Sequence, residues 1–315
     1  MADSDLLNAE AAASLLHIGR NAVYALAKSG DLPSYRLGRK LLFDPTDLEA
    51  YRQRQRSASE GAPAEADHSE GGALGRLAPA ADADSFHIAG QGVPCGLIVE
   101  RLEQQELPSQ RVAVTGYQAL VALYEGTVDA AVVHLYDQRS NSYNIPYVQC
   151  LAPGLPVVVY RLVRRQVGLL VAEGNPRGIA SWGALLREGI RIANRPLGCA
   201  SRILLDEKLL AMEANPLLIA GYRRPHPTAL AAAEAVANGA ADAAVADEST
   251  AAQASGVTFV PLQHEWVDIA VAKRGSDRRL ARRLRNALDD AAFKREYARI
   301  VHGDTSALGS IVYEC

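Results

Sequence analysis

The sequence has few cysteines, no long apolar run and no excess of positive charge. Only 4 of the 315 residues are cysteine. They are too few and too widely spaced for a disulfide framework or a CxxC zinc site, so we expect reduced thiols, no structural metal and no cofactor. No run of about 18 residues is continuously apolar, and the N-terminal region lacks the basic start and cleavage site of a secretory signal. We therefore expect a cytoplasmic protein that does not bind membranes.

The formal net charge is −3, with 33 Lys and Arg residues against 36 Asp and Glu residues. A nucleic-acid binder that is basic over its whole surface is thereby excluded, and any DNA-binding surface must be local. Hydrophobic residues make up 49% and charged residues 22% of the chain, which is the usual mixture of a folded protein. The length favours about two domains.

The composition changes sharply after Arg56 and again at Ser85. Residues 57–84 are almost entirely Ala, Gly, Ser, Pro, Glu and Asp, and they include no aromatic or β-branched residue. Such a segment cannot bury enough apolar surface to offset its loss of conformational entropy. We therefore predict a head over residues 1–56, a flexible linker over 57–84 and a body over 85–315.

The head has the pattern of a helix-turn-helix. A first helix over residues 8–17 begins at Asn8, a favoured N-cap residue. A second helix over residues 20–29 has one apolar face and ends at Gly30. Residues 34–43 alternate in hydropathy around a central glycine, as a β-hairpin does.

Four motifs relate this head to known DNA-binding domains. They are N-A-V-Y at 21–24, S-G-D-L-P at 29–33, R-L-G-R-K at 36–40 and D-L-E-A-Y at 47–51. With these motifs, residues 6–53 resemble the excisionase-type winged helix-turn-helix, except that Gly19 stands where a serine cap is common. The resemblance implies that the head binds double-stranded DNA, with the second helix at the bases and the hairpin at the phosphates.

Local charge agrees with this resemblance, because residues 20–40 contain five basic residues and one acidic residue. The expected DNA-binding residues are Arg20, Asn21, Tyr24, Lys28, Tyr35, Arg36, Arg39 and Lys40. The alternative is a head that binds another protein through the same basic surface.

The body contains an internal repeat. Residues 117–133 and 230–246 each run from an apolar helix into Gly-x-x-Asp-Ala-Ala-Val. The matching pairs are Gly126 with Gly239 and Asp129 with Asp242. Each copy reads as a helix that ends at a glycine and is followed by a parallel strand. The repeat predicts two similar α/β lobes, and chance similarity in an alanine-rich chain is the alternative.

The rest of the body also alternates between strands and helices. Strands are expected at 157–163, 167–172, 190–193, 217–222, 258–262 and 267–272, and helices at 181–188, 201–213 and 277–300. This alternation predicts an α/β fold with a parallel sheet and crossover helices. We expect lobe 1 over about residues 85–160 and 265–315, lobe 2 over about 161–264, and a cleft between them.

Several segments of the body match a second family. They are H-L-Y-D at 134–137, Y-N at 143–144, G-N-P at 174–176, the run from Asn194 to Asp206, and F-V-P-L at 259–262 with Glu265 and Asp268 after it. With them, residues 85–299 resemble the periplasmic-binding-protein-like domain, related to molybdate-binding proteins, that occurs behind helix-turn-helix heads. The resemblance implies a two-lobed type II fold that holds a small ligand between its lobes.

Two departures from that family concern the ligand. Residues 198–202 read G-C-A-S-R where the family usually has Gly-Ser-Gly-Thr-Arg, and Gly116-Tyr117 stands where Gly-Ser is usual. A thiol and a phenol thus replace two hydroxyl groups that suit an oxyanion. The ligand expected from the resemblance is a molybdate- or tungstate-type oxyanion, and the alternative is a larger organic or aromatic acid.

The predicted ligand-binding residues lie at helix starts and strand ends. They are Gln91, Cys95, Tyr117, His134, Asn144, Arg195, Cys199, Ser201 and Arg202. Unpaired N–H groups at helix starts accept anions, and arginines bind them bidentately. Ser201 has helix capping as its alternative role, and Arg202 has an ion pair with Asp206. Cleft tyrosines, including Tyr136, either stack on the ligand or belong to the core.

Cys95 and Cys199 lie at expected helix starts, where the pKa of a thiol falls. An oxidant- or metal-sensing role of these thiols is an alternative to ligand binding. Together the two resemblances imply a transcriptional regulator without enzymatic activity, in which the ligand in the cleft controls DNA binding. We expect a homodimer or higher homo-oligomer because one winged head reads few base pairs. The alternatives are an enzyme with Cys199 as nucleophile and His134 or His226 as base, or an adaptor whose head binds protein.

Overall fold

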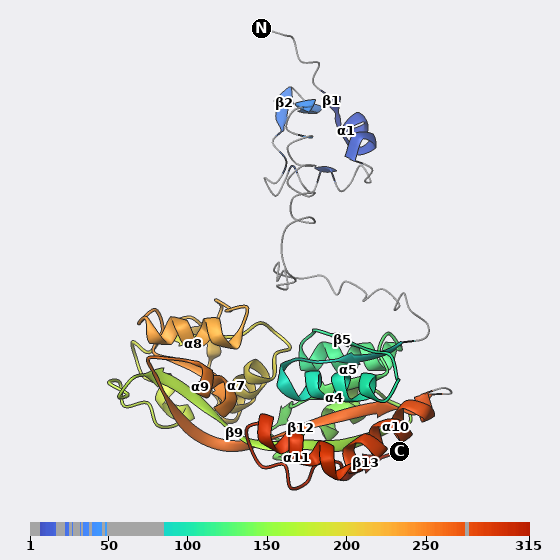
Figure 1. Ribbon diagram of the computed structural model, residues 1–315. Coiled ribbons are helices and arrows are strands. Elements are labelled where there is room, and N and C mark those ends of the chain that lie inside the picture. Colours follow the sequence, from blue (N-terminus) through green and yellow to red (C-terminus); the bar gives the residue numbers. More distant parts are fainter. Residues whose placement is uncertain are drawn as a thin grey trace. The chain divides into compact units, whose positions relative to one another are not determined.

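The computed structural model describes residues 7–16, 23–24, 27, 32, 34–37, 40–45, 48, 85–274 and 277–315. The chain divides into two compact units, Met1–Gly72 and Ala73–Cys315 (Figure 1). This division falls within the segment predicted as a linker, whose bounds stay a prediction.

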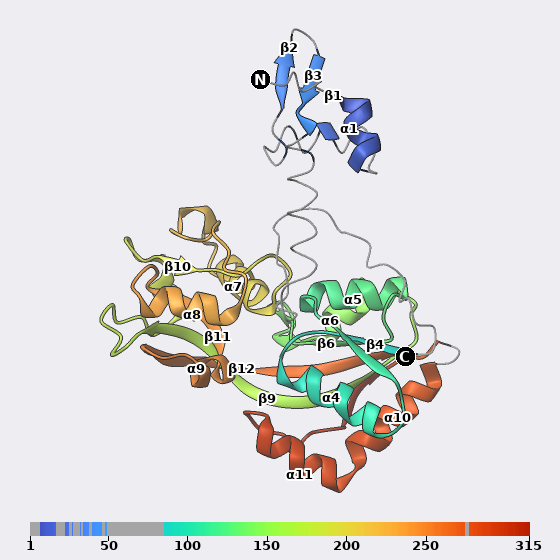
Figure 2. The same ribbon diagram turned by 45° about the horizontal axis from the view of Figure 1, so that its top comes forward.

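The head unit contains a helix and a small antiparallel sheet. Its described elements are β1 (Leu7–Asn8), α1 (Ala9–Leu16), β2 (Tyr35–Leu37) and β3 (Lys40–Phe43), with the strand order β1-β3-β2 (Figure 2). The side chain of Asn8 accepts hydrogen bonds from the N–H groups of Glu10 and Ala11, at 3.0 and 2.9 Å, so the predicted N-cap is confirmed. The predicted hairpin is also present, as β2 pairs with β3. Val23 is buried and Tyr24 is 47% exposed, which agrees with a second helix that has one apolar face.

The strands of the body form one curled sheet. Eight strands are described in it: β4 (Phe86–Ala89), β5 (Ser109–Val112), β6 (Ala130–Val133), β9 (Val157–Ala172), β10 (Ile192–Ala193), β11 (Ala243–Asp247), β12 (Val257–Ala272) and β13 (Ile311–Glu314). Their order is β10-β11-β9-β12-β6-β4-β5, and β13 pairs with β9. The pairs β4–β5, β4–β6 and β10–β11 are parallel, as the sequence predicts for each lobe.

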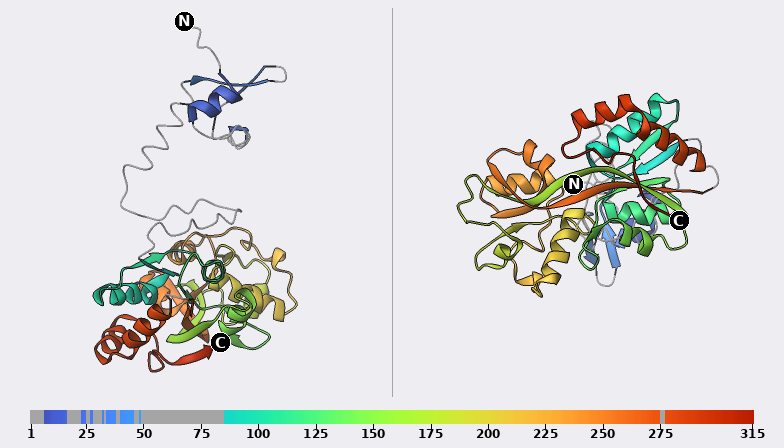
Figure 3. Two further views of the ribbon diagram at one scale, coloured as in Figure 1. Left: turned by 90° about the vertical axis from the view of Figure 1, so that its right-hand side faces the viewer. Right: turned by 90° about the horizontal axis from the view of Figure 1, so that it is seen from below.

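The prediction of a parallel sheet is wrong for β9 and β12. The sequence predicts two short strands in place of each, yet each is continuous over 16 residues, and they pair antiparallel to each other. They run side by side through both lobes (Figure 3). The segments between the predicted short strands remain paired across the two strands: Arg164, Arg165 and Gln166 lie opposite Trp266, Glu265 and His264.

The helices cover both faces of the sheet. They are α4 (Gly92–Gln104), α5 (Gly116–Glu125), α6 (Ile145–Leu151), α7 (Ala200–Ala211), α8 (Ala229–Ala237), α9 (Glu248–Gln253), α10 (Asp277–Asp289) and α11 (Ala291–Ile300), with 3-10 turns η1 (Trp182–Leu186) and η2 (Pro216–Leu218). A hairpin of β7 (Tyr136–Asp137) and β8 (Ser142–Tyr143) follows β6.

Three further expected elements differ from the observed ones. The helix predicted over 181–188 is the short turn η1. The strand predicted over 217–222 is absent, because Leu217 and Leu218 belong to η2 and Ala220 forms only a single bridge, with Arg191. The helix predicted over 277–300 is two helices, because Asp290 caps α11 by accepting hydrogen bonds from the N–H groups of Ala292 and Phe293.

Alternate side chains of the long strands pack into different cores. In lobe 1, one face of the sheet packs against α4, α10 and α11 and the other face against α5 and α6. In lobe 2, one face packs against α7 and the other against α8. Because successive side chains of a strand point to opposite faces, nearly continuous apolar runs are required there. The expected two-lobed α/β body is confirmed.

The internal repeat corresponds to α5–β6 in lobe 1 and α8–β11 in lobe 2. Gly126 and Gly239 both have left-handed backbones, with φ of 78° and 76°. Asp129 Oδ2 accepts the N–H of His87 at 2.7 Å, and Asp242 Oδ2 accepts the N–H of Arg191 at 2.8 Å. Each aspartate thus ties the start of its strand to the neighbouring parallel strand, so the two copies are structurally equivalent.

Candidate functional site

The two lobes meet where the N-terminus of α5 approaches the loop before α7. The backbone N–H of Tyr117 donates to the carbonyl of Gly198 at 3.3 Å. Gly198 has φ +84°, and a Cβ on it would lie 2.7 Å from Thr115 Oγ1. A glycine is therefore required for this close approach. We call the contacts between these two segments, together with those of the β7–β8 hairpin, the interlobe junction.

The β7–β8 hairpin leaves lobe 1 and packs on lobe 2. Tyr136 and Tyr143 are 2% and 7% exposed and belong to the apolar cluster around α7, with ring centroids 5.2 Å apart. Lys208 of α7 donates to Tyr136 Oη at 2.9 Å, and Glu207 accepts the N–H of Gln138 at 3.1 Å. These two tyrosines are therefore packed in the core, while Tyr117 is 38% exposed.

Arg195 is a buried cation near the start of α7. It is 8% exposed, and its Nη1 donates to the carbonyl of His226 at 2.7 Å. Burial lowers the pKa of its guanidinium, and the neighbouring Cys199 partly opposes that shift. Within the described ranges, no carboxylate forms an ion pair with Arg195, so this site has a positive charge that an anion would neutralise.

Arg202 differs from Arg195 in this respect. Its Nε donates to both carboxylate oxygens of Asp206 at 2.9 Å, and its guanidinium lies 4.1 Å from the ring centroid of Tyr222. The ion pair of Arg202 with Asp206, predicted as the alternative to ligand binding, is therefore present. A role of Arg202 in ligand binding stays a prediction.

The predicted fall in the pKa of the two buried thiols is wrong. Burial raises the pKa of Cys199, although Arg195 and Arg202 act in the opposite direction. Burial raises the pKa of Cys95 to about 11, and Cys95 is fully buried in lobe 1. Desolvation of the thiolate therefore exceeds the effect of the helix N-terminus.

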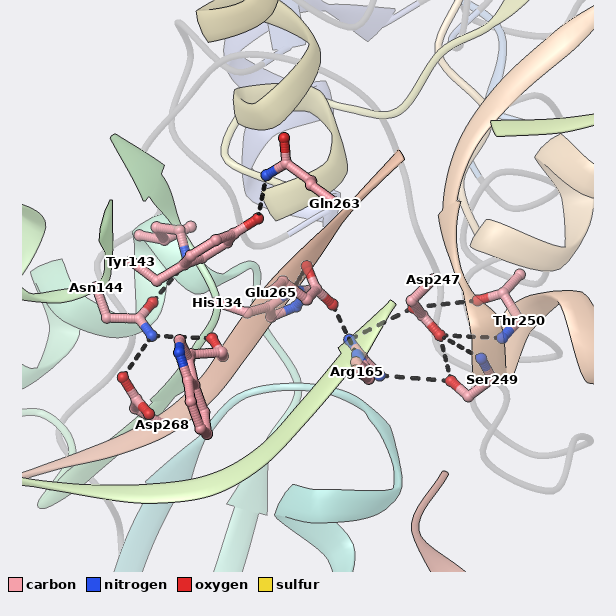
Figure 4. Close-up of polar contacts among 12 residues, drawn as sticks. His134, Tyr143, Asn144, Arg165, Asp247, Ser249, Thr250, Gln263, Glu265 and Asp268 are labelled. Carbon is pink, nitrogen blue, oxygen red and sulfur yellow. Dashed lines mark hydrogen bonds and ion pairs between the residues drawn. The ribbon is translucent and has the colours of Figure 1, made fainter. Parts of the chain in front are cut away.

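A chain of polar side chains runs along the long strands at the centre of the body (Figure 4). His134, at the end of β6, has its Nδ1 3.3 Å from Glu265 Oε2. Glu265 Oε1 accepts from Arg165 Nε at 2.7 Å. Arg165 Nη2 lies 3.4 Å from Asp247 Oδ2, at the end of β11. Asp247 also caps α9 by accepting from the N–H groups of Ser249 and Thr250.

A second polar group lies beside this chain, around Asp268. Asn144 is fully buried, and its amide donates to Asp268 Oδ2 at 2.7 Å and to the carbonyl of Trp266 at 3.0 Å. Its own oxygen accepts the N–H of Leu135 at 2.7 Å. Arg161 Nη1 donates to Asp268 at 2.8 Å, yet burial raises the pKa of Asp268 to about 6. Asn144 thus has three partners within the protein.

The remaining predicted ligand residues are placed as follows. Ser201 is in the first turn of α7, but the N-cap is Cys199, so the capping alternative for Ser201 is wrong. Gln91 is exposed at the N-cap of α4, and its side chain makes no capping hydrogen bond. The structure brings Tyr117 to the loop before α7, and Cys199 lies beside Arg195 and Arg202. Among the described residues, neither Gln91 nor Cys95 forms a hydrogen bond to another predicted ligand residue.

The DNA-binding residues are described only in part. Tyr24 is 47% exposed. The backbones of Tyr35 and Arg36 lie in β2 and that of Lys40 in β3. Arg20, Asn21, Lys28 and Arg39 lie outside the described residues. The DNA-binding roles of all these residues stay predictions.

Sequence reasoning did not propose Arg165, Glu265, Asp247 or Asp268 as site residues. One signal was available, because Asp247 follows the second copy of the repeat as His134 follows the first. Within the described part of the chain, no group of three or more His, Cys, Asp or Glu residues is arranged to hold a metal ion, and no helix is long and apolar enough to cross a membrane.

Both the head and the body match known protein families. Residues 99–289 match the family model described as PBP superfamily domain, and residues 6–56 match a helix-turn-helix domain. The uncharacterized protein YvgK of Bacillus subtilis (strain 168) is 33% identical over 310 residues, which is 97% of each chain. A Clostridium pasteurianum protein encoded in the ferredoxin 2Fe-2S gene 5' region is 33% identical over 112 residues, which is 36% of this chain and 99% of that one.

Among solved structures, the fold is similar to that of the ancestral amino acid-binding protein AncCDT-1, a precursor of cyclohexadienyl dehydratase. The TM-score is 0.50 at 18% sequence identity, over 69% of this chain and 95% of the other. At this identity the likeness concerns the fold alone.

Proposed function

The chain belongs to the PBP superfamily, and since it joins that domain to a helix-turn-helix domain, we propose that it is a transcriptional regulator whose DNA binding is controlled by a small ligand held between the lobes. The observation that carries this proposal is the presence of both domains in one chain. A DNA-binding domain alone would need no second binding site, and a transport protein would need no DNA-binding head.

The charge of Arg195, next to the interlobe junction, favours an anionic ligand. Arg161, Arg165 and Arg202 each have a carboxylate partner. The described contacts of the Arg195 guanidinium are the carbonyl of His226 and the neutral thiol of Cys199, and no described carboxylate pairs with it. A carboxylate or oxyanion at Arg195 would also meet the N-terminus of α7, whose free N–H groups favour negative charge. We propose Tyr117, Arg195 and Cys199 as the core of the ligand site.

The side chains at the starts of α5 and α7 favour an organic acid over a bare oxyanion. Cys199 and the partly exposed ring of Tyr117 provide apolar contact area, and neither offers the aliphatic hydroxyl group that suits an oxyanion. Ligand binding would shift the lobes between two arrangements and so change the spacing of paired heads on DNA. A homodimer is part of this proposal, because one winged head contacts few base pairs.

The DNA-binding half is tested by selecting duplexes from a random library with the full chain, followed by gel-shift titration. We expect enrichment of one sequence class. The double variant Arg36→Ala with Arg39→Ala should lose that binding. The double variant Arg223→Ala with Arg224→Ala removes the same charge from exposed positions on the body and should retain it. Absence of any sequence preference, with and without each candidate ligand, would refute the regulator and leave the adaptor alternative.

The ligand half is tested by a thermal-shift screen of the full chain against molybdate, tungstate, sulfate and a panel of organic and aromatic acids. A ligand at about 100 times its Kd adds roughly 2.7 kcal/mol of stability. We expect organic acids to raise the Tm, and Arg195→Met to abolish that rise. Cys199→Ser returns a hydroxyl to the N-cap and should shift the preference toward oxyanions. A response to oxyanions alone in the unmodified chain would show that the family's usual ligand is retained.

The geometry gives no support to an enzyme with Cys199 as nucleophile. The thiol is 7% exposed, and burial raises its pKa, which disfavours the thiolate. Its neighbours are arginines. Of the two bases proposed for it, His134 pairs with Glu265, and His226 contacts Arg195 through its backbone carbonyl. Activity lost in Cys199→Ala would be required to revive that alternative.

A further inference from the structure

The ends of the central polar chain occupy equivalent places in the two lobes. His134 directly follows the first copy of the internal repeat, and Asp247 directly follows the second. Between them, Arg165 of β9 and Glu265 of β12 are direct partners in the strand register. The chain therefore joins one lobe's strand end to the other's through the two strands that the lobes share.

The centre of this chain lies where the long strands are irregular. The register of β9 and β12 shifts between Pro261 and Gln263 and again between Val267 and Asp268. Glu265 lies between these two shifts. Register irregularities bend strands and increase their twist, so this is the segment where a change in the angle between the lobes is most readily absorbed.

Because these polar side chains are buried, their contacts are important for the lobe arrangement. The side chains of Glu265, Arg165, Asp247 and His134 are 4%, 10%, 17% and 30% exposed. The Arg165 guanidinium holds the pKa of Glu265 and Asp247 below their ordinary values, so both carboxylates are ionised at neutral pH. Loss of one partner would leave a buried charge uncompensated, which is costly.

We propose that Glu265 and Arg165 are positioning residues that couple the angle between the lobes to the placement of His134 and Asp247. Glu265 holds His134 by its Nδ1 and leaves Nε2 on the other side of the ring. Arg165 holds Asp247, which caps α9. The row of polar side chains from His134 to Asp247 fixes the lobe arrangement in which Tyr117 contacts Gly198. The coupling of the lobes does not depend on the proposed function, while its consequence for DNA binding rests on that function.

The test is a distance measurement between the lobes in the full chain, without ligand or DNA. Spin labels are placed by Glu125→Cys on α5 and Glu234→Cys on α8, both exposed. Cys150→Ser and Cys315→Ser remove the exposed native thiols. Pulsed dipolar spectroscopy then gives the populations of short and long distances. Failure of the chain to bind DNA would not affect this result.

We expect one main distance in the labelled parent, and a second, different distance in Glu265→Gln and in Arg165→Met. The population ratio should change at least about tenfold, which corresponds to about 1.4 kcal/mol. Arg191→Met is the control, since it removes an arginine that pairs with Asp242 inside lobe 2 and should leave the distances unchanged. Unchanged distances in Glu265→Gln and Arg165→Met would overturn the proposal.

An exchanged pair separates this role from simple strand pairing. Glu265→Arg combined with Arg165→Glu restores a cross-strand ion pair, but it places a cation at His134 and a carboxylate at Asp247. The second distance should therefore persist, and a return to the parent distance would show that only strand pairing matters. If these variants do not fold, as judged by circular dichroism, His134→Gln and the cap-preserving Asp247→Asn replace them. Parent-like distances in both would likewise overturn the proposal.

Discussion

Removing either aspartate of the internal repeat should destabilise the body, and Asp129→Ala should have the larger effect, because His87 is buried while Arg191 is exposed. Asp129→Ala deletes the acceptor of the His87 N–H, and His87 is only 8% exposed. An unsatisfied buried N–H costs about 1–3 kcal/mol. Asp242→Ala deletes the corresponding acceptor of the Arg191 N–H. Its ion pairs involve arginine side chains that are 47% and 48% exposed, and pairs of that kind contribute about 0–1 kcal/mol.

These magnitudes set the size of the expected effect. A loss of about 2 kcal/mol lowers the Tm by about 4–8 °C in a domain of 150–250 residues. Asp129→Asn keeps a side-chain oxygen that accepts the same N–H, so most of the stability should remain. Asp289→Ala is the surface control, since Asp289 is 58% exposed and lies 3.8 Å from an exposed arginine.

The assay is urea and thermal unfolding of the full chain, followed by circular dichroism. Both alanine variants should unfold well below the parent, and Asp289→Ala should be nearly unchanged. If the alanine variants lose no more stability than Asp289→Ala, then the carboxylates do not tie the strands together. If only one of the pair loses stability, the two copies are not energetically equivalent.

Three further predictions follow from the same structure. Burial raises the pKa of Asp268 from 3.8 to about 6, so urea unfolding should show stability falling by up to about 3 kcal/mol as pH rises from 4 to 6, a fall absent from Asp268→Asn. A Cβ on Gly168 would collide with a carbonyl oxygen of β12, so Gly168→Ala should lower the Tm, whereas Gly96→Ala within α4 should raise the stability by up to about 1 kcal/mol. A thiol reagent should react rapidly with the exposed Cys150 and Cys315, and with the two buried cysteines only after unfolding.

Local signals in the sequence were sufficient for several single elements. The N-cap at Asn8 in the head and the left-handed Gly126 in lobe 1 depend on residues close in the chain, and the structure contains both. The repeat also predicted the equivalent strands of the two lobes, but the partners of its aspartates lie 42 and 51 positions away. The thiol prediction failed for a different reason. A helix start can be recognised from the sequence, but the burial that raises the pKa of Cys95 depends on strands and helices far along the chain.

The long strands β9 and β12 show why the sequence did not predict the central polar residues. Arg165 interrupts one apolar run and Glu265 interrupts another, 100 residues later, so each interruption looked like a loop between two short strands. An ionised group within a strand becomes acceptable when its partner lies directly opposite, and the register supplies that partner. The two polar interruptions are therefore a single non-local signal. Neighbouring runs that carry opposite charges at matched positions predict one long strand pair, and they locate the place where the lobes are coupled.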